Sequence, residues 1–242
     1  MSIAEKLTKV AENEKKVYDA GYENGEKDGY NEGYNTYCDL IWEAFQDGGT
    51  RTDYKKAFYN WDKFTECFKP KYDIKPTGSV AEMFANINQY VSVPNVCAAL
   101  GITIDFSRAT EFRNILQGSA IWHFGVVDCS SATTLDYAFY LASSLQKIDK
   151  LILHEGIVSY TACFANISQL KDITIEGTIA GTGIVLSAHT GLTHDSLMSF
   201  INALKDYSGT ATTKTITLGT TNLAKLTDSE KAVATQKGWT LA

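Results

Sequence analysis

Short alternations of apolar and polar residues recur along the middle of the chain. Six runs are rich in β-branched and other apolar residues: 102–106, 126–129, 151–154, 173–176, 183–186 and 215–218. Several of them alternate with period two, which is typical of a strand with one buried face. The pattern predicts a series of short strands, none of which can bury its apolar face alone.

A second pattern repeats between these runs. The sequence FANINQ, beginning at Phe84, returns as FANISQ at Phe164, and two degenerate copies lie around Leu116 and Phe139. From Leu116 the copies are 23 and then 25 residues apart, whereas the interval from Phe84 is 32 residues and requires an insertion. A unit of this length with one strand falls in the range of leucine-rich repeats. Stacked units of that kind bury a common core beside a ladder of parallel strands.

These units resemble the BspA-type leucine-rich repeat, whose pattern is roughly F-x-x-C-x-x-L-x-x-I-x-I. Two units carry the matching residues, which are Phe164, Leu170, Ile173 and Ile175 in one and Phe139, Leu145, Ile148 and Leu151 in the other. The cysteine is not reproduced, because Cys163 precedes the phenylalanine. The resemblance covers residues 80–187 and points to proteins of gut Firmicutes and of their phages and prophages. Both ends of the chain, MSIAEKLTKVAENEKKVYDAG and LTDSEKAVATQKGWTLA, are similar to such proteins.

The C-terminal part predicts two helices and a final strand. After Thr193, a capping residue, residues 193–205 place four apolar side chains on one helical face: Leu197, Phe200, Ile201 and Leu204. Thr227 and Glu230 have the spacing of a capping box at the start of a second helix. Residues 239–241 follow as a strand. Terminal repeats need such atypical ends, so this part is expected to be a cap.

The N-terminal segment predicts a helical stem. A short coiled-coil seam and a four-residue glycine period run along residues 3–45, and we expect both to mediate self-association. The seam and glycine positions are Ile3, Leu7, Val10, Val17, Gly21, Gly25, Gly29 and Gly33. Four glycines cost a helix about 3–4 kcal/mol relative to alanine. A flexible linker over residues 18–36 therefore remains the alternative.

Aromatic residues and lysines crowd the segment that follows, residues 50–79. The rings are Tyr54, Phe58, Tyr59, Trp61, Phe64, Phe68 and Tyr72. Such a cluster is typical of a packed junction at one end of a repeat domain. Aromatic side chains interleaved with lysine also suit contact with a glycan or a nucleotide base.

Charge and composition exclude two classes of protein. The net charge of −6 falls wholly in residues 1–47, and the rest of the chain is balanced. No basic stripe for nucleic acid is present, so nucleic-acid binding is not expected. With no apolar run of about 18 residues, no membrane insertion is expected either. Hydrophobic residues make up 44% of the chain, which is enough for a folded core.

Residue types with catalytic or metal chemistry are scattered. The five cysteines are odd in number and lack zinc spacing. His189, His194 and Asp195 could meet at a metal only through loop geometry, and a turn and a helix cap explain them more simply. No phosphate loop, dinucleotide fingerprint or nucleophile elbow occurs. We therefore expect no catalytic residue, no metal and no cofactor.

One row of side chains could bind a partner. Alignment of the strands by parity puts Asp105, Asp128, His154 and Glu176 on the outward side of successive strands. Acidic side chains on neighbouring strands could take up a cation or a basic protein surface. The alternative is a solvated face that keeps an exposed sheet in solution.

The patterns together predict an α/β protein in four parts: a stem (1–49), an aromatic junction (50–79), a short leucine-rich-repeat-like solenoid (80–190) and an α/β cap (191–242). The expected function is non-enzymatic. We expect a phage virion-associated component (tail, fibre or decoration), made in the bacterial cytoplasm, that contacts itself, other virion proteins or a host-surface protein or glycan. A bacterial cell-surface adhesin of the same class is the alternative, disfavoured because the N-terminus lacks the apolar region of a secretory signal. An enzyme would require a pocket with convergent titratable groups.

Overall fold

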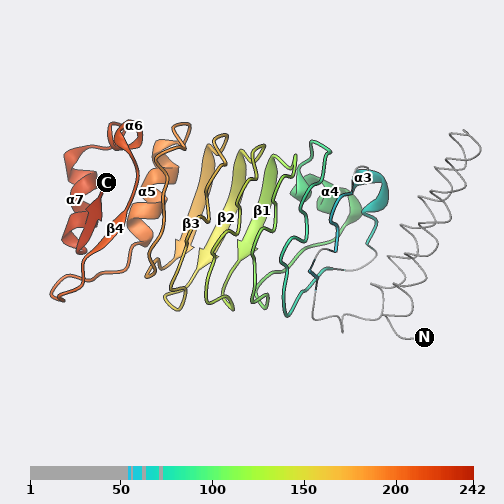
Figure 1. Cartoon of the computed structure of the whole chain (residues 1–242), viewed down its shortest axis with the longest axis horizontal. Coiled ribbons are helices and arrows are strands. Elements are labelled where there is room, and N and C mark those ends of the chain that lie inside the picture. Colours follow the sequence, from blue (N-terminus) through green and yellow to red (C-terminus); the bar gives the residue numbers. More distant parts are fainter. Residues whose placement is uncertain (1–53, 56, 62–63, 71–72) are drawn as a thin grey trace, which may run out of the picture.

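A three-stranded parallel sheet lies at the centre of the computed structural model, which describes residues 54–242 except 56, 62–63 and 71–72 (Figure 1). The strands, β1 (His123–Asp128), β2 (Lys147–Leu153) and β3 (Asp172–Gly177), lie side by side in chain order. The chain is therefore a mixed α/β protein with parallel strands, as its sequence predicts. The predicted stem, residues 1–49 with its seam and glycine positions, lies outside the described residues.

The register of the sheet changes along its length. Val127 pairs with Leu151, and Asp128 pairs with Ile152, which pairs in turn with Glu176. Between Ile148 and Leu151 the pairing of β2 with β3 shifts. Such a bulge adds a residue to one strand and breaks the strict alternation of buried and exposed side chains.

A tight turn recurs before each strand region. Its centres are the four positions at which the copies of the internal repeat align. Phe84, Leu116, Phe139 and Phe164 each have residues of positive φ two positions before and two positions after them. These flanking residues are Glu82 and Asn86, Asn114 and Gly118, Tyr137 and Leu141, and Ala162 and Asn166. Each turn donates backbone N–H groups to the next one, for example from Phe84 to the Ile115 carbonyl at 2.9 Å. The turns are therefore stacked through main-chain bonds that do not depend on the side chains.

Aromatic rings from successive turns fill the interior. Phe139 and Phe164 stack at 5.8 Å between ring centroids, and Phe164 meets Phe200 edge-on at the same distance. At the other end Phe84 packs against Phe58 at 5.1 Å and against Phe124 at 5.5 Å. All six rings are buried. The core is thus continuous along the described part of the chain.

The long interval after Phe84 contains a helix that the sequence pattern did not predict. Helix α4 (Val93–Leu100) begins at the N-cap Ser92 and ends at Gly101, which has a φ of 67°. The shorter helix α3 (Phe64–Cys67) precedes it. Both lie at the same end of the row of strands (Figure 1). The extra residues in the 32-residue interval therefore form α4 and the segment that leads from it back to the stacked strands.

The C-terminal elements agree with their capping signals. Thr193 caps α5 (His194–Ala203), and Thr227 and Glu230 form the capping box of α7 (Asp228–Gln236). Strand β5 (Trp239–Leu241) pairs in parallel with β4 (Lys214–Ile216), and α6 (Thr220–Leu223) lies between β4 and α7 in the sequence. The helices predicted after Thr193 and at Thr227 and the final strand are confirmed.

Candidate functional site

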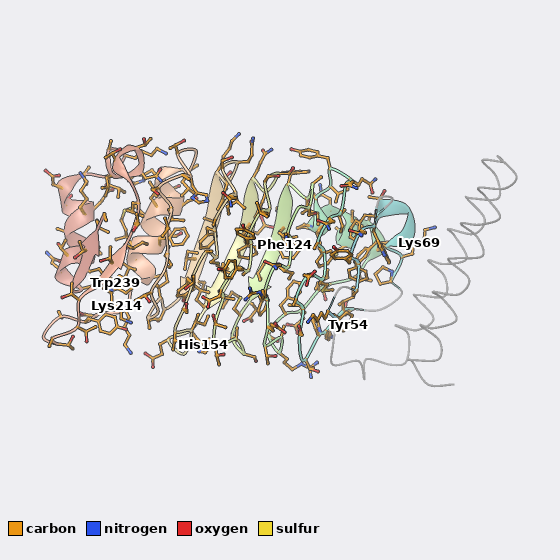
Figure 2. The ribbon with its side chains drawn as sticks, in the orientation of Figure 1. Tyr54, Lys69, Phe124, His154, Lys214 and Trp239 are labelled. Carbon is orange, nitrogen blue, oxygen red and sulfur yellow. The ribbon has the colours of Figure 1, made fainter. Side chains whose placement is uncertain are left out.

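Three of the four side chains expected on the outward face form turns: Asp128 at the end of β1, His154 directly after β2, and Asp105 next to the isolated bridge at Ile104. Asp105 accepts the N–H of Ser107 at 2.9 Å, and Asp128 accepts that of Ser130 at the same distance. The Nδ1 atom of His154 accepts the N–H of Gly156 at 3.1 Å. In each case the side chain bonds the backbone two residues later, the pattern of an Asx-turn. Figure 2 shows His154 at the edge of the molecule where the strands end.

The local bonds determine the state of these groups. The hydroxyl and N–H of Ser107 donate to Asp105 and hold the pKa of that carboxyl below its ordinary value. His154 also contacts the Ala132 carbonyl through Nε2 at 2.8 Å. Since Nδ1 is an acceptor, the Nε2–H form of the neutral ring satisfies both contacts. His154 therefore joins two neighbouring chain segments and presents no free ring nitrogen.

Glu176 differs from the other three. Its carboxylate pairs with Lys150 at 2.6 Å, and both side chains are about half exposed. In the register of the sheet Ile152 lies between Asp128 and Glu176, and His154 lies two residues beyond that row. Asp128 and Glu176 thus share a row with Ile152, and His154 lies outside that row. Parity in the sequence predicts on which side of a strand these residues lie, and it does not predict their level along the strands.

A polar cluster that the sequence analysis missed joins α4 to the sheet. Ser92 Oγ lies 2.9 Å from His123 Nδ1, and His123 Nε2 lies 2.9 Å from an oxygen of Asp149. Lys147 pairs with the other oxygen of Asp149 at 3.0 Å. Partial burial acts to raise the pKa of Asp149, but the close contacts with Lys147 and His123 outweigh it and hold the pKa below its ordinary value. Asp149 is thus ionised and compensated at neutral pH.

The cluster has the residue types of a serine hydrolase triad, and its geometry differs from that arrangement. Ser92 is 6% exposed, and its Oγ accepts the N–H of Asn95 as the cap of α4. Asp149 lies off the hydrogen-bonding direction of His123 Nε2, although the two atoms are close. A nucleophile must reach the substrate and transfer its proton along the bond to its base. These contacts instead anchor the first turn of α4 to β1 and β2.

A pocket of about 480 Å³ lies beside this cluster. Its wall combines α4, the returning segment 102–106 and β1, with Asp149 at the lining. Ile104 pairs with Ile74 on one side, while residues 124–128 of β1 pair only with β2, so within the described residues the ladder is interrupted between Ile104 and β1. Cys97 lines the pocket, and burial raises its pKa to about 11. The thiol is therefore protonated and weakly nucleophilic at neutral pH.

Among the described aromatic residues, most rings of the predicted junction are buried, whereas Tyr90 is exposed. The rings of Tyr54, Phe58, Trp61, Phe64 and Phe68, all from the predicted junction, are buried. Tyr90 is 61% exposed and stacks on the half-buried Trp122. The sequence analysis missed this pair. Trp122 directly precedes His123, the first residue of β1, and Tyr90 lies two residues before Ser92, which pairs with His123. The five buried rings of the predicted junction are therefore covered, whereas Tyr90, outside that segment, is accessible to a ligand.

The histidines considered for a metal have other partners. His189 is buried, with Nε2 at 2.7 Å from the Phe164 carbonyl, and His194 Nε2 lies 2.8 Å from Glu230. Within the part of the chain that the structure describes, no three histidine, cysteine, aspartate or glutamate side chains gather as a metal site requires. Among the same residues, no helix is both long enough and apolar enough to cross a membrane.

Comparison with known proteins adds no relative to this picture. No protein-family model, curated protein or solved structure matches the chain. Function is therefore argued from the geometry above and from the repeat pattern of the sequence.

Proposed function

We propose that residues 80–190 form a short leucine-rich-repeat-like solenoid and that residues 191–242 cap it. This proposal rests on the recurrence of one turn. At each of its four centres, the residues two positions before and two positions after have a positive φ. Burial supports it as well, because all eight residues that match the BspA-type pattern are buried. They are Phe139, Leu145, Ile148, Leu151, Phe164, Leu170, Ile173 and Ile175. Stacking of such units gives a long, rigid flank suited to contact with another macromolecule.

We infer from this architecture a non-enzymatic structural or binding protein, a component of a phage virion that displays the solenoid on a tail, fibre or capsid surface. The resemblance of the opening sequence to phage- and prophage-encoded proteins, and of the closing sequence to caps in proteins of gut Firmicutes and of their phages, favours this role. The polar cluster around His123 supports it too, since its contacts serve to anchor α4. Neighbouring virion proteins, or a protein or glycan on the host surface, would be the partners.

The virion proposal is tested in the strain that carries the gene. After induction, virions are purified on a density gradient, analysed by peptide mass spectrometry and labelled with antibodies against the protein. Peptides and label on intact particles are the expected result. Recovery from the cell envelope alone would favour the adhesin, and recovery from the cytosolic fraction alone would contradict both functions.

The N-terminal segment is proposed to oligomerise the protein. Light scattering should give a multiple of 26.6 kDa for the full chain and a monomer for a chain that begins at Thr50. A full-length variant with Leu7→Asp and Val10→Asp, which places charge in the seam, should also be monomeric. Circular dichroism checks that each protein is folded. A monomeric wild-type chain would contradict the stem.

A further inference from the structure

Three rings form a short row at the start of β1, which runs from the exposed Tyr90 through the half-buried Trp122 to the largely buried His123. Tyr90 stacks nearly parallel on Trp122, with 6.1 Å between centroids and 22° between planes. Trp122 in turn lies 5.2 Å from the ring of His123. Tyr90 is the outermost ring, with 61% of its surface exposed. An aromatic face left open to water in this way is a frequent feature of binding surfaces.

Contacts from three neighbouring chain segments fix the row in place. The N–H of Trp122 donates to the Val91 carbonyl at 3.1 Å, and the N–H of Gln146 donates to the Trp122 carbonyl at 2.8 Å. The Gln146 side chain reaches back and donates from Nε2 to the Tyr90 hydroxyl at 2.9 Å. Tyr90 is thus held over Trp122 through the backbone of the next residue, Val91, and through its own hydroxyl. A ligand that packs on a ring already held in position loses less affinity to ordering of the protein.

The groups around the rings are polar and nearly balanced in charge. Gln146 offers its amide oxygen and one further N–H, and Lys147 and Asp149 offer a donor and an acceptor that compensate each other at 3.0 Å. Asp149 is also in contact with His123. Among the described residues, no strong field of one sign surrounds Tyr90, so this surface does not select a highly charged ligand.

We propose that Tyr90 and Trp122, with Gln146, Lys147 and Asp149 at their edge, bind a neutral carbohydrate. A pyranose ring presents a flat face of C–H groups, which packs on the electron-rich face of an aromatic ring. The edge of the sugar ring carries hydroxyl groups, each of which can donate and accept a hydrogen bond. They match the amide of Gln146, the ammonium of Lys147 and the carboxylate of Asp149. A few placed polar groups beside an apolar contact face are what such a ligand site requires.

This inference deepens the proposed binding function and rests on it for its biological meaning. Sugar binding is measured on the purified chain, whereas the virion role is measured on particles. A protein found in virions can fail to bind sugar, and a sugar-binding protein can be absent from virions. Failure of one proposal is therefore distinguishable from failure of the other.

The test uses the purified full chain on a printed array of bacterial and mammalian oligosaccharides, followed by calorimetric titration with the strongest neutral probe. We expect binding to neutral saccharides that persists in 0.5 M NaCl, because it does not depend on ion pairs. Tyr90→Ala and Trp122→Ala should each weaken it about 10- to 30-fold, the loss expected for an aromatic residue at the centre of an interface. Tyr90→Phe, which keeps the ring and loses the bond from Gln146, should weaken it less.

Tyr140→Ala is the matched control. Tyr140 is partly exposed and packs edge-on against Tyr137, with 5.5 Å between the ring centroids. The substitution therefore removes a surface ring outside the proposed site. The affinity of the Tyr140→Ala variant for the saccharide should equal that of the wild type. Because Tyr90 is largely exposed, Tyr90→Ala is not expected to unfold the chain, and circular dichroism verifies this. Absence of array binding, binding only to charged glycans, or equal loss in Tyr140→Ala and Tyr90→Ala would overturn the proposal.

Discussion

Asp105, Asp128 and His154 occupy comparable places in the backbone, because each accepts the N–H two residues later at the end of a strand region. Their common feature is an acceptor atom on a short side chain rather than a negative charge. A neutral histidine nitrogen replaces a carboxylate oxygen without loss of the turn. At the scale of the residue, the geometry therefore explains this polar position as part of the fold.

Substitution at Asp128 separates the turn from the charge. Asp128→Asn keeps an acceptor oxygen and should change the free energy of unfolding by less than about 0.5 kcal/mol, whereas Asp128→Ala should lower it by about 1 kcal/mol. Urea denaturation followed by circular dichroism measures both. Glu176→Gln, which removes the charge of an exposed ion pair, is the control and should cost less than about 1 kcal/mol. Equal losses for Asn and Ala at position 128 would show that the charge matters.

At the scale of the element, local signals and long-range pairing differ in what the sequence reveals. The capping box of α7 involves residues three positions apart, so the sequence alone predicts it. Helix α4 carries Ser92 and Gly101 at its ends, but its eight residues, VPNVCAAL, lack the polar face that marks an amphipathic helix. The Ser92, His123 and Asp149 cluster depends on which segments become neighbours and on a register that shifts within β2. No local pattern contains that information.

The aromatic row makes a prediction for the packing of successive turns. Phe139 is fully buried and stacks on Phe164, so Phe139→Ala should leave a cavity and lower the free energy of unfolding by about 3–5 kcal/mol. Phe139→Leu places at this turn the residue type that position 116 carries, and it should cost about 1–2 kcal/mol. Urea denaturation measures both variants. A cost below 1 kcal/mol for Phe139→Ala would mean that the row does not form the core.

The contact between α5 and α7 predicts a dependence on pH. Bonds from His194 to Glu230 and to Asp195 raise the pKa of His194 above its ordinary value. A raised pKa in the folded state stabilises the protein fully below the unfolded pKa of histidine, about 6.5, and the contribution is lost as the pH rises through the folded value. His194→Gln should therefore destabilise the chain more at a pH of about 5.5 than at a pH of about 8.5. Thermal unfolding of both proteins at the two pH values measures this, and a larger effect at the higher pH would contradict the assignment.

At the scale of the whole molecule, the main-chain bonds between successive turns and strands place distant residues side by side. The repeat spacing of the sequence locates the turn centres, and the β-prone runs between them predict the parallel strands. The spacing does not locate the stacked rings of Tyr90 and Trp122, because their proximity arises only when the segments around Ser92 and His123 pair. The proposed solenoid, its cap and its binding surface all depend on this side-by-side arrangement.

Disulfide trapping measures that arrangement most directly. Paired positions on neighbouring parallel strands lie about 4.8 Å apart, within the range that a disulfide spans, whereas strands separated by a third lie beyond it. Oxidation should therefore link Val126→Cys with Lys150→Cys and Ile152→Cys with Glu176→Cys, and should leave Val126→Cys and Glu176→Cys unlinked. Peptide mass spectrometry of the oxidised protein identifies each link. Linkage of Val126→Cys to Glu176→Cys, or failure of both neighbouring pairs to link, would contradict the account.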